Sequence, residues 1–564
     1  MAPALVLGIT GLFAAGCGGG STSNGGDATG TTAPVGVQKN QVVQDNAKPV
    51  SGGSITYGLE AESDGFNPTI NRWAISGVMV GLAVYDPLAA YNDKNEAKPY
   101  LAQSITPNDT FTVWTIKLRA NVKFSNGTPL TSAAVKATLD GHLASPLTKP
   151  VFSPVKTIEN TDDLTTVVTM KSPWVVFPST LTAQSGVIPE PSTLVVDAAG
   201  STLAAATPIG TGPFVQTEWK KDASWKGTKN PTYWRKDKDN TQLPYLDKLE
   251  FRPIPEQDSR QKGLESGDLQ MMHSNDTKAI TNYRKLAADG KFQIVEDNGE
   301  GEEGFIILNS AKAPFDDVNA RRALAYATDT VEYGATVNDG ILEPADGPFR
   351  KNSVWHSNYK NYPNFDMAKA TDLVNKYKAD HGGQAPTFEV GITKDSNQQA
   401  AFLQQGWQTA GFDVKIKTVD QAVFILDAVQ GHYQANLWRQ FGAPDPDADA
   451  IWWDSANAGN GGEGGLALNI ARHKSPCADA ALKKGRENAD LSVRKQAYAD
   501  LQQCFADEVP YVWLDHTVWA VMAANNVRGI TNGPLPDGSP SLPIGGAGDF
   551  GGVTRLTQTW LAPK

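Results

Sequence analysis

The sequence predicts an α/β protein with several domains or lobes. Residues 368–382 and 398–411 have the pattern of helices, and each segment ends in glycine, which often closes a helix. Each helix is followed by a segment with the pattern of a strand, at 387–393 and 412–419. Such alternation is typical of an α/β lobe. The chain has 564 residues, which is enough for several units of roughly 100–200 residues.

Further strands are indicated by alternating side chains and by turn residues. In 111–119, Trp114, Ile116 and Leu118 face one way, as expected for a strand with one buried face. The segment 207–234 contains strand and turn material rich in Trp and Gly. Other strands are predicted at 54–61, 246–254 and 302–309, and residues 164–181 are predicted to contain a strand and the segment that leaves it.

Capping residues mark the starts of further helices. Residues 131–143 are predicted to be helical, with Thr131 or Ser132 as the N-cap. A second helix is predicted to start at Asp316 or Asp317 and to end near residue 329. Residues 259–272 are predicted to form a helix followed by a strand.

Composition and charge exclude several classes of protein. Hydrophobic residues make up 40% of the chain and charged residues 20%, which is ordinary for a globular protein. The net charge of -11 argues against nucleic-acid binding, which requires clusters of Lys and Arg. The three cysteines form no CxxC pair and no cluster with histidines at zinc spacing, so neither a metal site nor a cofactor is expected.

The N-terminal segment has the features of an export signal. Residues 2–16 are apolar and end in small residues, and Ala15-Gly16-Cys17 resembles the lipobox of bacterial lipoproteins. That resemblance implies a signal peptide at 1–17 with lipidation of Cys17. The alternative is an ordinary secretory peptide with an incidental cysteine. Residues 18–47 are rich in Gly, Ser, Thr and Asn, which predicts a flexible tether.

Six motifs in order resemble those of one protein family. The motifs are WTIKLRANVKFSNGTPLTSAAV (114–135), PIGTGPF with NPTYW (208–214 and 230–234), LESGDLQM (264–271), LNSAKAPFDDVNARRALAYATD (308–329), AKATDLVNKY (368–377) and RKQAYADLQQCFADEVPYVWL (494–514). Together they resemble the family-five extracellular solute-binding proteins of ABC importers, which include oligopeptide-, dipeptide- and nickel-binding proteins. The resemblance extends from residue 51 to residue 528.

The resemblance implies a two-lobed α/β architecture, the type II periplasmic-binding-protein fold, with an additional subdomain and a ligand cleft between the lobes. Such proteins close by hinge motion around the ligand. Asn309 is expected at a hinge crossing. The implied segments are 48–85, 207–308 and 516–564 for lobe 1, 86–206 for the subdomain and 309–515 for lobe 2.

The resemblance also indicates where a ligand is expected to bind. Family members that bind peptides hold them along strand backbones, and an Asp shortly after a Trp binds the peptide amine. Here Trp438 matches the Trp, but the Asp position falls on Phe441 or Gly442. Asp445 is a candidate substitute. Alternatively, the ligand has no free amine or its amine binds elsewhere, and residues 445–450 form a solvated acidic loop.

Three further residues are candidates for the ligand site. Glu60 and Phe66 match a region that lines the cleft in relatives, and Trp513 lies near the crossing of the chain between the lobes. No residue is expected to be catalytic, because the sequence contains no GxSxG or HExxH motif. His516 is interpreted as a partly buried strand residue.

Cys477 and Cys504 are predicted to form a disulfide. Ser475 and Pro476 have the pattern of a helix start, with Ser as N-cap and Pro at the first helical position. Cys504 lies on the apolar side of a second predicted helix, and neighbouring cysteines pair in the oxidising compartments that exported proteins reach. The alternative is two buried thiols.

The predicted function is that of the substrate-binding component of an ABC importer. It captures peptides and delivers them to the permease subunits. The alternatives are an oligosaccharide, haem, a nickel chelate or a glutathione-like compound as ligand and, more remotely, a secreted hydrolase. The protein is expected to be a monomer, exported to the outer face of the cytoplasmic membrane and bound to that membrane only by its lipid.

Overall fold

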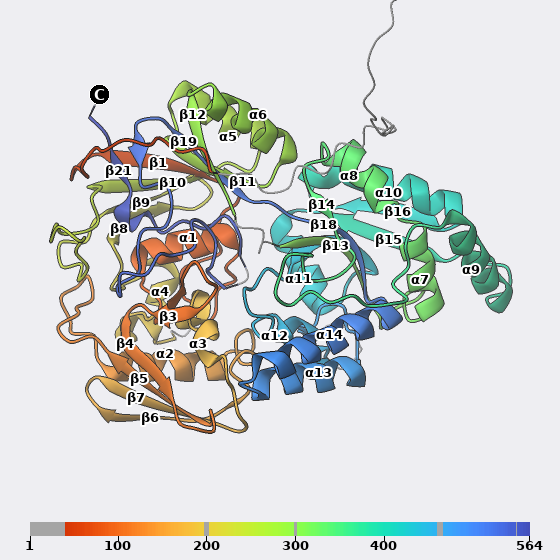
Figure 1. Ribbon diagram of the computed structural model, residues 1–564, viewed down its shortest axis with the longest axis horizontal. Coiled ribbons are helices and arrows are strands. Elements are labelled where there is room, and N and C mark those ends of the chain that lie inside the picture. Colours follow the sequence, from red (N-terminus) through yellow and green to blue (C-terminus); the bar gives the residue numbers. More distant parts are fainter. Residues whose placement is uncertain (1–39, 197–201, 298–301, 460–465, 549, 564) are drawn as a thin grey trace, which may run out of the picture. The chain divides into compact units, whose positions relative to one another are not determined.

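Two large β-sheets organise the chain, and a third, smaller sheet is inserted after the first strand and helix (Figure 1). The computed structural model describes residues 40–196, 202–297, 302–459, 466–548 and 550–563. The proposed lipidation site Cys17 lies outside these residues. Among the described residues, no helix is both long enough and apolar enough to cross a membrane.

The first sheet has seven strands in the order β12-β19-β11-β1-β10-β9-β8. Its strands are β1 (Ser54–Leu59), β8 (Phe214–Lys220), β9 (Ser224–Lys229), β10 (Lys248–Pro253), β11 (Met271–Ser274), β12 (Phe292–Glu296) and β19 (Ala520–Ala524). Its helices are α1 (Ile75–Val84), α5 (Gln257–Ser266) and α6 (Thr277–Ala288). Tyr57 and Met271 pack with α1 on one face, whereas Met272 packs with α5 and α6 on the other. Helix α1 is buried on all sides, which fits its uniformly apolar sequence.

The second sheet has six strands in the order β14-β18-β13-β17-β15-β16. Its strands are β13 (Glu303–Leu308), β14 (Glu343–Pro344), β15 (Thr387–Ile392), β16 (Asp413–Thr418), β17 (Ala435–Gln440) and β18 (Tyr511–His516). Ile306 and Leu308 pack under helices α7 (Val318–Tyr326), α8 (Thr330–Val337), α9 (Met367–Asp380) and α10 (Asn397–Ala410). Phe305 and Ile307 pack on the opposite face, which is covered by α11 (Gln421–Gln430), α12 (Ala450–Trp453), α13 (Pro476–Glu487) and α14 (Leu491–Glu508).

The third sheet has four strands in the order β4-β5-β7-β6. Its strands are β4 (Ala102–Pro107), β5 (Val113–Leu118), β6 (Val155–Asp162) and β7 (Thr165–Met170), and helix α2 (Ser132–Ala144) packs against them. Trp114, Ile116 and Leu118 are buried in this core, as their alternation predicted. Short elements complete the fold: β2 (Ala89–Tyr91), β3 (Ala97–Pro99), α3 (Phe177–Thr180), α4 (Leu203–Ala206), β20 (Val527–Arg528) and β21 (Trp560–Leu561).

The chain changes between the first and second sheets at two places. One change falls between β12, which ends at Glu296, and β13, which begins at Glu303; the other falls between β18 and β19. The expectation of a crossing at Asn309 is therefore wrong, because β13 pairs with β17 and β18 in the second sheet. Residues 303–308 and His516 were predicted to belong to lobe 1. Because they pair within β13 and β18, they belong to the second sheet instead. The rest of the division into lobes stays a prediction.

The predicted helix starts agree with the structure. Asp317 is the N-cap of α7, and its side chain accepts a hydrogen bond from the backbone N–H of Asn319. Thr131 is the N-cap of α2. Gly411 closes α10 in the left-handed conformation that glycine adopts without strain.

Candidate ligand-binding site

A cluster of charged and aromatic side chains lies where the chain changes sheets. The indole Nε1 of Trp519 donates a hydrogen bond to Glu302 Oε2 (2.9 Å), and the Trp519 backbone N–H donates to Asp297 Oδ2 (2.9 Å). The guanidinium carbon of Arg439 lies 5.3 Å from the centre of the Trp519 ring, and its Nε is 3.9 Å from Glu302 Oε2. We call Glu302, Arg439 and Trp519 the crossing cluster.

Arg439 is the member of the crossing cluster that is most open to solvent. Its side chain is 36% exposed, compared with 10% for Glu302, and the whole Trp519 residue is 1% exposed. The flat guanidinium group lies over the aromatic face of Trp519, which restricts its orientation. The cluster therefore presents a positioned cation to solvent.

Glu60 approaches the same cluster from the first sheet. Its backbone N–H donates a hydrogen bond to His273 Nε2 (3.1 Å), and the His273 ring centre lies 5.5 Å from that of Trp519. Burial lowers the pKa of His273 to about 3, with smaller contributions from Arg260 and Arg439, so the imidazole is neutral and can accept this bond. Glu60 itself is half-buried at the end of β1.

A second buried acid lies beside the crossing at the end of β18. Burial raises the pKa of Asp515 to about 6, although Asn338 and Thr517 donate hydrogen bonds to its carboxylate. Gly304 makes room for this carboxylate, because a Cβ atom at that position would lie 2.9 Å from Asp515 Oδ1. His516 next to it is a strand residue, as predicted, but it is fully buried and its Nδ1 is 3.3 Å from Glu303 Oε1.

The structure places three of the predicted ligand-site residues in the apolar core. Phe66 is fully buried against Trp219, with ring centres 4.7 Å apart. Phe441 stacks flat on Phe305 at 4.9 Å, and Trp513 packs against the same ring at 5.3 Å. In this conformation Phe66, Phe441 and Trp513 contribute packing rather than exposed contact surface, because neighbouring aromatic rings cover them.

The acidic segment after Phe441 is buried, so the expectation of a solvated loop is wrong. Asp445 Oδ1 lies 2.7 Å from Arg494 Nη2, and both side chains are at most 10% exposed. Asp447 accepts hydrogen bonds from Arg486 Nε (2.8 Å) and from Trp174 Nε1 (2.7 Å). The arginines that neutralise these acids come from α13 and α14, far away in sequence. Asp445 is thus already engaged in an internal ion pair, which leaves it poorly placed to bind a ligand amine.

Trp438 lies within β17 and is half-buried. Its Nε1 donates a hydrogen bond to Gln440 Oε1 (2.9 Å), and its ring lies 5.0 Å from that of Phe424 in α11. Sequence reasoning missed Arg439, although it directly follows Trp438, because the search there was for a carboxylate. The usable signal was a charged residue in the strand that carries the matched Trp.

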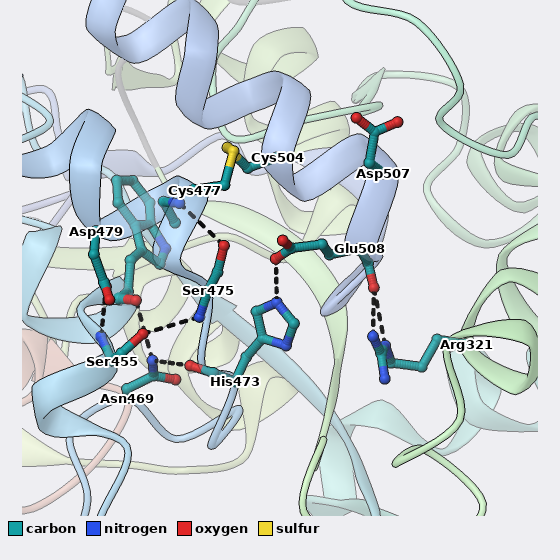
Figure 2. Close-up of polar contacts among 12 residues, drawn as sticks. Arg321, Ser455, Asn469, His473, Ser475, Cys477, Asp479, Cys504, Asp507 and Glu508 are labelled. Atoms are coloured by element: carbon teal, nitrogen blue, oxygen red, sulfur yellow. Dashed lines mark hydrogen bonds and ion pairs between the residues drawn. A yellow bond between two sulfur atoms is a disulfide. The ribbon is translucent and has the colours of Figure 1, made fainter.

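Cys477 and Cys504 form a disulfide between α13 and α14, with Cα atoms 6.0 Å apart (Figure 2). Ser475 is the N-cap of α13, as predicted, and its Oγ accepts a hydrogen bond from the Ala478 N–H (3.0 Å). Nearby, His473 Nε2 lies 2.6 Å from Glu508 Oε2. Among the residues that the structure describes, no group of three or more His, Cys, Asp or Glu side chains could hold a metal ion.

Two sheets joined by paired crossings, with a polar cluster at those crossings, define a bilobal α/β binding protein. A family model described as bacterial extracellular solute-binding proteins, family 5 Middle, matches residues 96–462, which is well over half of the chain. The chain therefore belongs to family 5 of the bacterial extracellular solute-binding proteins, and the predicted family and fold class are confirmed.

Individual relatives are distant but similar over most of their length. The glutathione-binding protein GsiB of Pectobacterium atrosepticum is 24% identical over 444 residues, covering 77% of this chain and 83% of the relative. The structure of DppA from Helicobacter pylori in complex with the peptide STSA has a TM-score of 0.77 at 21% identity, covering 91% of this chain and 99% of the other. That of AgaA from A. tumefaciens R10 with agropinic acid has a TM-score of 0.78 at 23% identity, with the same coverage. The two structures show the shared fold.

Proposed function

We propose that this protein captures a short peptide or a peptide-like acid outside the cell and delivers it to the membrane subunits of an ABC importer. The observation that carries the ligand assignment is Arg439, a partly exposed cation held over Trp519 where the two sheets are joined. Membership of a solute-binding family supports the transport role. The protein binds its cargo and leaves it chemically unchanged.

Arg439 favours a ligand with a carboxylate. A guanidinium group offers paired N–H donors that match the two oxygens of a carboxylate. The position at which the family resemblance places an amine-binding Asp falls on Phe441 or Gly442, and neither residue carries a carboxylate. Glu60, half-buried at the end of β1, is the candidate for receiving a ligand amine in place of that Asp.

The ligands named for similar proteins agree with this assignment. GsiB is named for glutathione, a tripeptide with two carboxylates; AgaA was crystallised with an acid, agropinic acid; and DppA was crystallised with a tetrapeptide. Members of the family bind such different molecules on one shared fold. We therefore expect the charged residues of the crossing cluster to determine which ligand this protein selects. Peptides with a free carboxylate agree with the ligands named for similar proteins, and their charge is complementary to that of Arg439.

The ligand class is tested by exposing the purified protein to a peptide pool and analysing the retained molecules by mass spectrometry. Short peptides with a free carboxyl terminus are the expected result. Recovery of sugars alone, or an unchanged melting temperature across peptide libraries, would contradict the peptide assignment.

The role of Arg439 is tested with Arg439→Gln. Binding of a retained peptide is expected to weaken by at least about tenfold, because a charge-assisted hydrogen bond is lost. The same peptide with an amidated carboxyl terminus should bind the variant and the unmodified protein equally weakly. Arg252→Gln is the matched control, because Arg252 pairs with Glu250 on a solvent-exposed part of β10. Titration calorimetry showing equal losses for both variants would refute the role.

We further propose that Cys17 carries a lipid that holds a monomeric binding protein at the outer face of the cytoplasmic membrane. Cys17→Ser is expected to shift the protein from the membrane fraction to the soluble fraction. Incorporation of a labelled fatty acid should be lost in parallel. Equal membrane association of both forms would contradict the anchor while leaving the ligand assignment unaffected.

A further inference from the structure

A contact outside the crossing cluster joins the two halves of the protein. We call the first and third sheets with their helices the first half, and the second sheet with its helices the second half. Trp174, which follows β7, donates a hydrogen bond through its indole Nε1 to Oδ2 of Asp447, which follows β17 (2.7 Å). We propose that Trp174, Asp447 and Arg486 of α13 form a latch that holds the two halves together and that opens when a ligand enters or leaves.

The third sheet is fixed to the first sheet by contacts of its own. Gln184, which follows α3, donates through its Nε2 to the carbonyl oxygens of Pro68 and Asn71 (2.8 Å each). Val187 packs in the same core as α1. The third sheet therefore belongs to the first half, and the bond from Trp174 connects that half to the second.

The Asp447 carboxylate bonds to both halves at once. Its Oδ1 accepts a hydrogen bond from Arg486 Nε within the second half (2.8 Å), and its Oδ2 accepts the bond from Trp174. The guanidinium carbon of Arg486 lies 5.5 Å from the centre of the Trp174 ring, so the indole contacts both members of the ion pair. The Asp447 side chain and Trp174 are each 2% exposed, and a hydrogen bond to a charged oxygen is strong at such burial.

A second residue of the first half faces the same acidic segment. Tyr91 in β2 is 1% exposed, and burial raises the pKa of its hydroxyl group. Asp445, Asp449 and Asp447 raise this pKa further, so all three acids lie within electrostatic range of the tyrosine. The interface between the halves therefore extends from Trp174 to β2, and the latch is part of a packed surface.

Each side of the latch keeps its own support when the halves separate. Asp447 retains its ion pair with Arg486, and the Trp174 ring retains its contact with Phe177, whose ring centre lies 5.2 Å away. Water can replace the partners of the groups that separate, because opening exposes these groups to solvent. Opening therefore leaves no buried charge without its counter-charge, which is the costly outcome that would make a contact irreversible.

The latch is expected to control how fast a ligand is exchanged. Because it consists only of protein groups outside the crossing cluster, it stabilises the joined form equally with and without a bound ligand. Its loss should therefore raise the rates of ligand entry and release by similar factors and leave their ratio, the affinity, nearly unchanged. This kinetic consequence rests on the binding role proposed above, whereas the latch itself does not.

The test uses Trp174→Phe, which removes the indole donor, keeps an aromatic ring and leaves the ion pair of Asp447 intact. The backbone N–H of Val175 donates to the carbonyl oxygen of Arg486 (3.1 Å), so its exchange with solvent reports on opening. In residue-resolved hydrogen–deuterium exchange of the full protein, this amide should exchange at least about tenfold faster in the variant. The amide of residue 174 donates to the carbonyl oxygen of Phe111 within the first half (3.0 Å) and should keep its rate.

Trp225→Phe is the matched control. Trp225 is also 2% exposed, and its Nε1 donates to Gln216 Oε1 (2.7 Å) between β9 and β8 of the first sheet. This variant loses an indole hydrogen bond of the same length inside one half, so the exchange rate of the Val175 amide should stay that of the unmodified protein.

Three results would overturn the latch. They are rapid exchange of the Val175 amide in the unmodified protein, equal exchange of that amide in Trp174→Phe and the unmodified protein, and equal acceleration of the amides of residues 174 and 175. The last result would show that Trp174 supports only its own region.

The kinetic role is measured by stopped-flow fluorescence with a peptide retained from the pool described above. Entry and release should both be faster in Trp174→Phe, with equal affinity. A loss of affinity at an unchanged release rate would contradict the kinetic role. If the protein retains no peptide, the proposed function fails, and the exchange result still decides whether the latch exists.

Discussion

Replacing Asp447 with alanine is expected to lower the free energy of unfolding by about 3–5 kcal/mol. The Asp447 side chain is 2% exposed, and it bonds both Arg486 Nε and Trp174 Nε1 at less than 3 Å. Its removal leaves a guanidinium group that is 20% exposed without its counter-charge and a buried indole N–H without an acceptor. Burial opposes the charged form of Arg486, but Asp447 outweighs burial and raises the pKa of Arg486.

The contact also joins segments that are distant in the sequence. Trp174 follows the third sheet, whereas Asp447 follows β17 of the second sheet. The backbone N–H of Val175 donates to the carbonyl oxygen of Arg486 (3.1 Å). Two hydrogen bonds from neighbouring residues, Trp174 and Val175, therefore connect the segment after the third sheet to the second-sheet region. The loss in Asp447→Ala should therefore weaken the docking of the third-sheet region as well as the local ion pair.

Urea unfolding followed by tryptophan fluorescence measures this loss. Asp500→Ala is the matched control, because the Asp500 side chain is 48% exposed and lies 3.6 Å from Lys484 Nζ; it should cost no more than about 1 kcal/mol. The double variant Asp447→Ala with Arg486→Met should recover part of the loss, since it removes the uncompensated charge. A loss of less than about 1 kcal/mol in Asp447→Ala would show that the ion pair is dispensable.

Loss of the disulfide is expected to cost about 3–4 kcal/mol. Cys477 and Cys504 are 27 residues apart, and cutting a loop of that length restores conformational freedom to the unfolded chain. The folded α13–α14 pair should survive, because Leu482, Tyr498 and Leu501 remain packed together. Ser475 also still caps α13 (Figure 2). The effect therefore appears in stability rather than in structure.

The measurement compares unfolding with and without a thiol reductant. The unmodified protein should unfold at a lower urea concentration when reduced, whereas Cys477→Ala with Cys504→Ala should show one midpoint in both conditions, close to that of the reduced protein. Ligand affinity should be equal in all four samples, because the bridge lies outside the crossing cluster. Identical midpoints for the oxidised and reduced protein would show that the disulfide does not contribute to the free energy of unfolding.

Local elements were largely predictable because their signals are local. The alternation around Trp114 predicted β5, the Ser475-Pro476 pair predicted the start of α13, and Asp317 was one of two predicted starts for α7. Each signal depends on residues within one or two turns of the chain. The order of the motifs then indicated the family, which the family model over residues 96–462 confirms.

The candidate site was less predictable because burial and pairing depend on distant segments. Asp445 and Asp447 look like a solvated acidic run in the sequence, yet Arg494 and Arg486 from the last two long helices neutralise them in the interior. Phe441 was considered because of its position after Trp438, and its ring instead stacks on Phe305 from β13.

The sequence by itself determined the family, the α/β class, most strands and helices, and the cysteine pair that the structure joins. Only the tertiary structure decided which sheet β13 joins, which acids are buried, and that Arg439 lies over Trp519 at the crossing. The physical reason is that backbone pattern and capping depend on neighbours in sequence, whereas desolvation and charge pairing depend on neighbours in space. The ligand preference proposed here rests on this second kind of information.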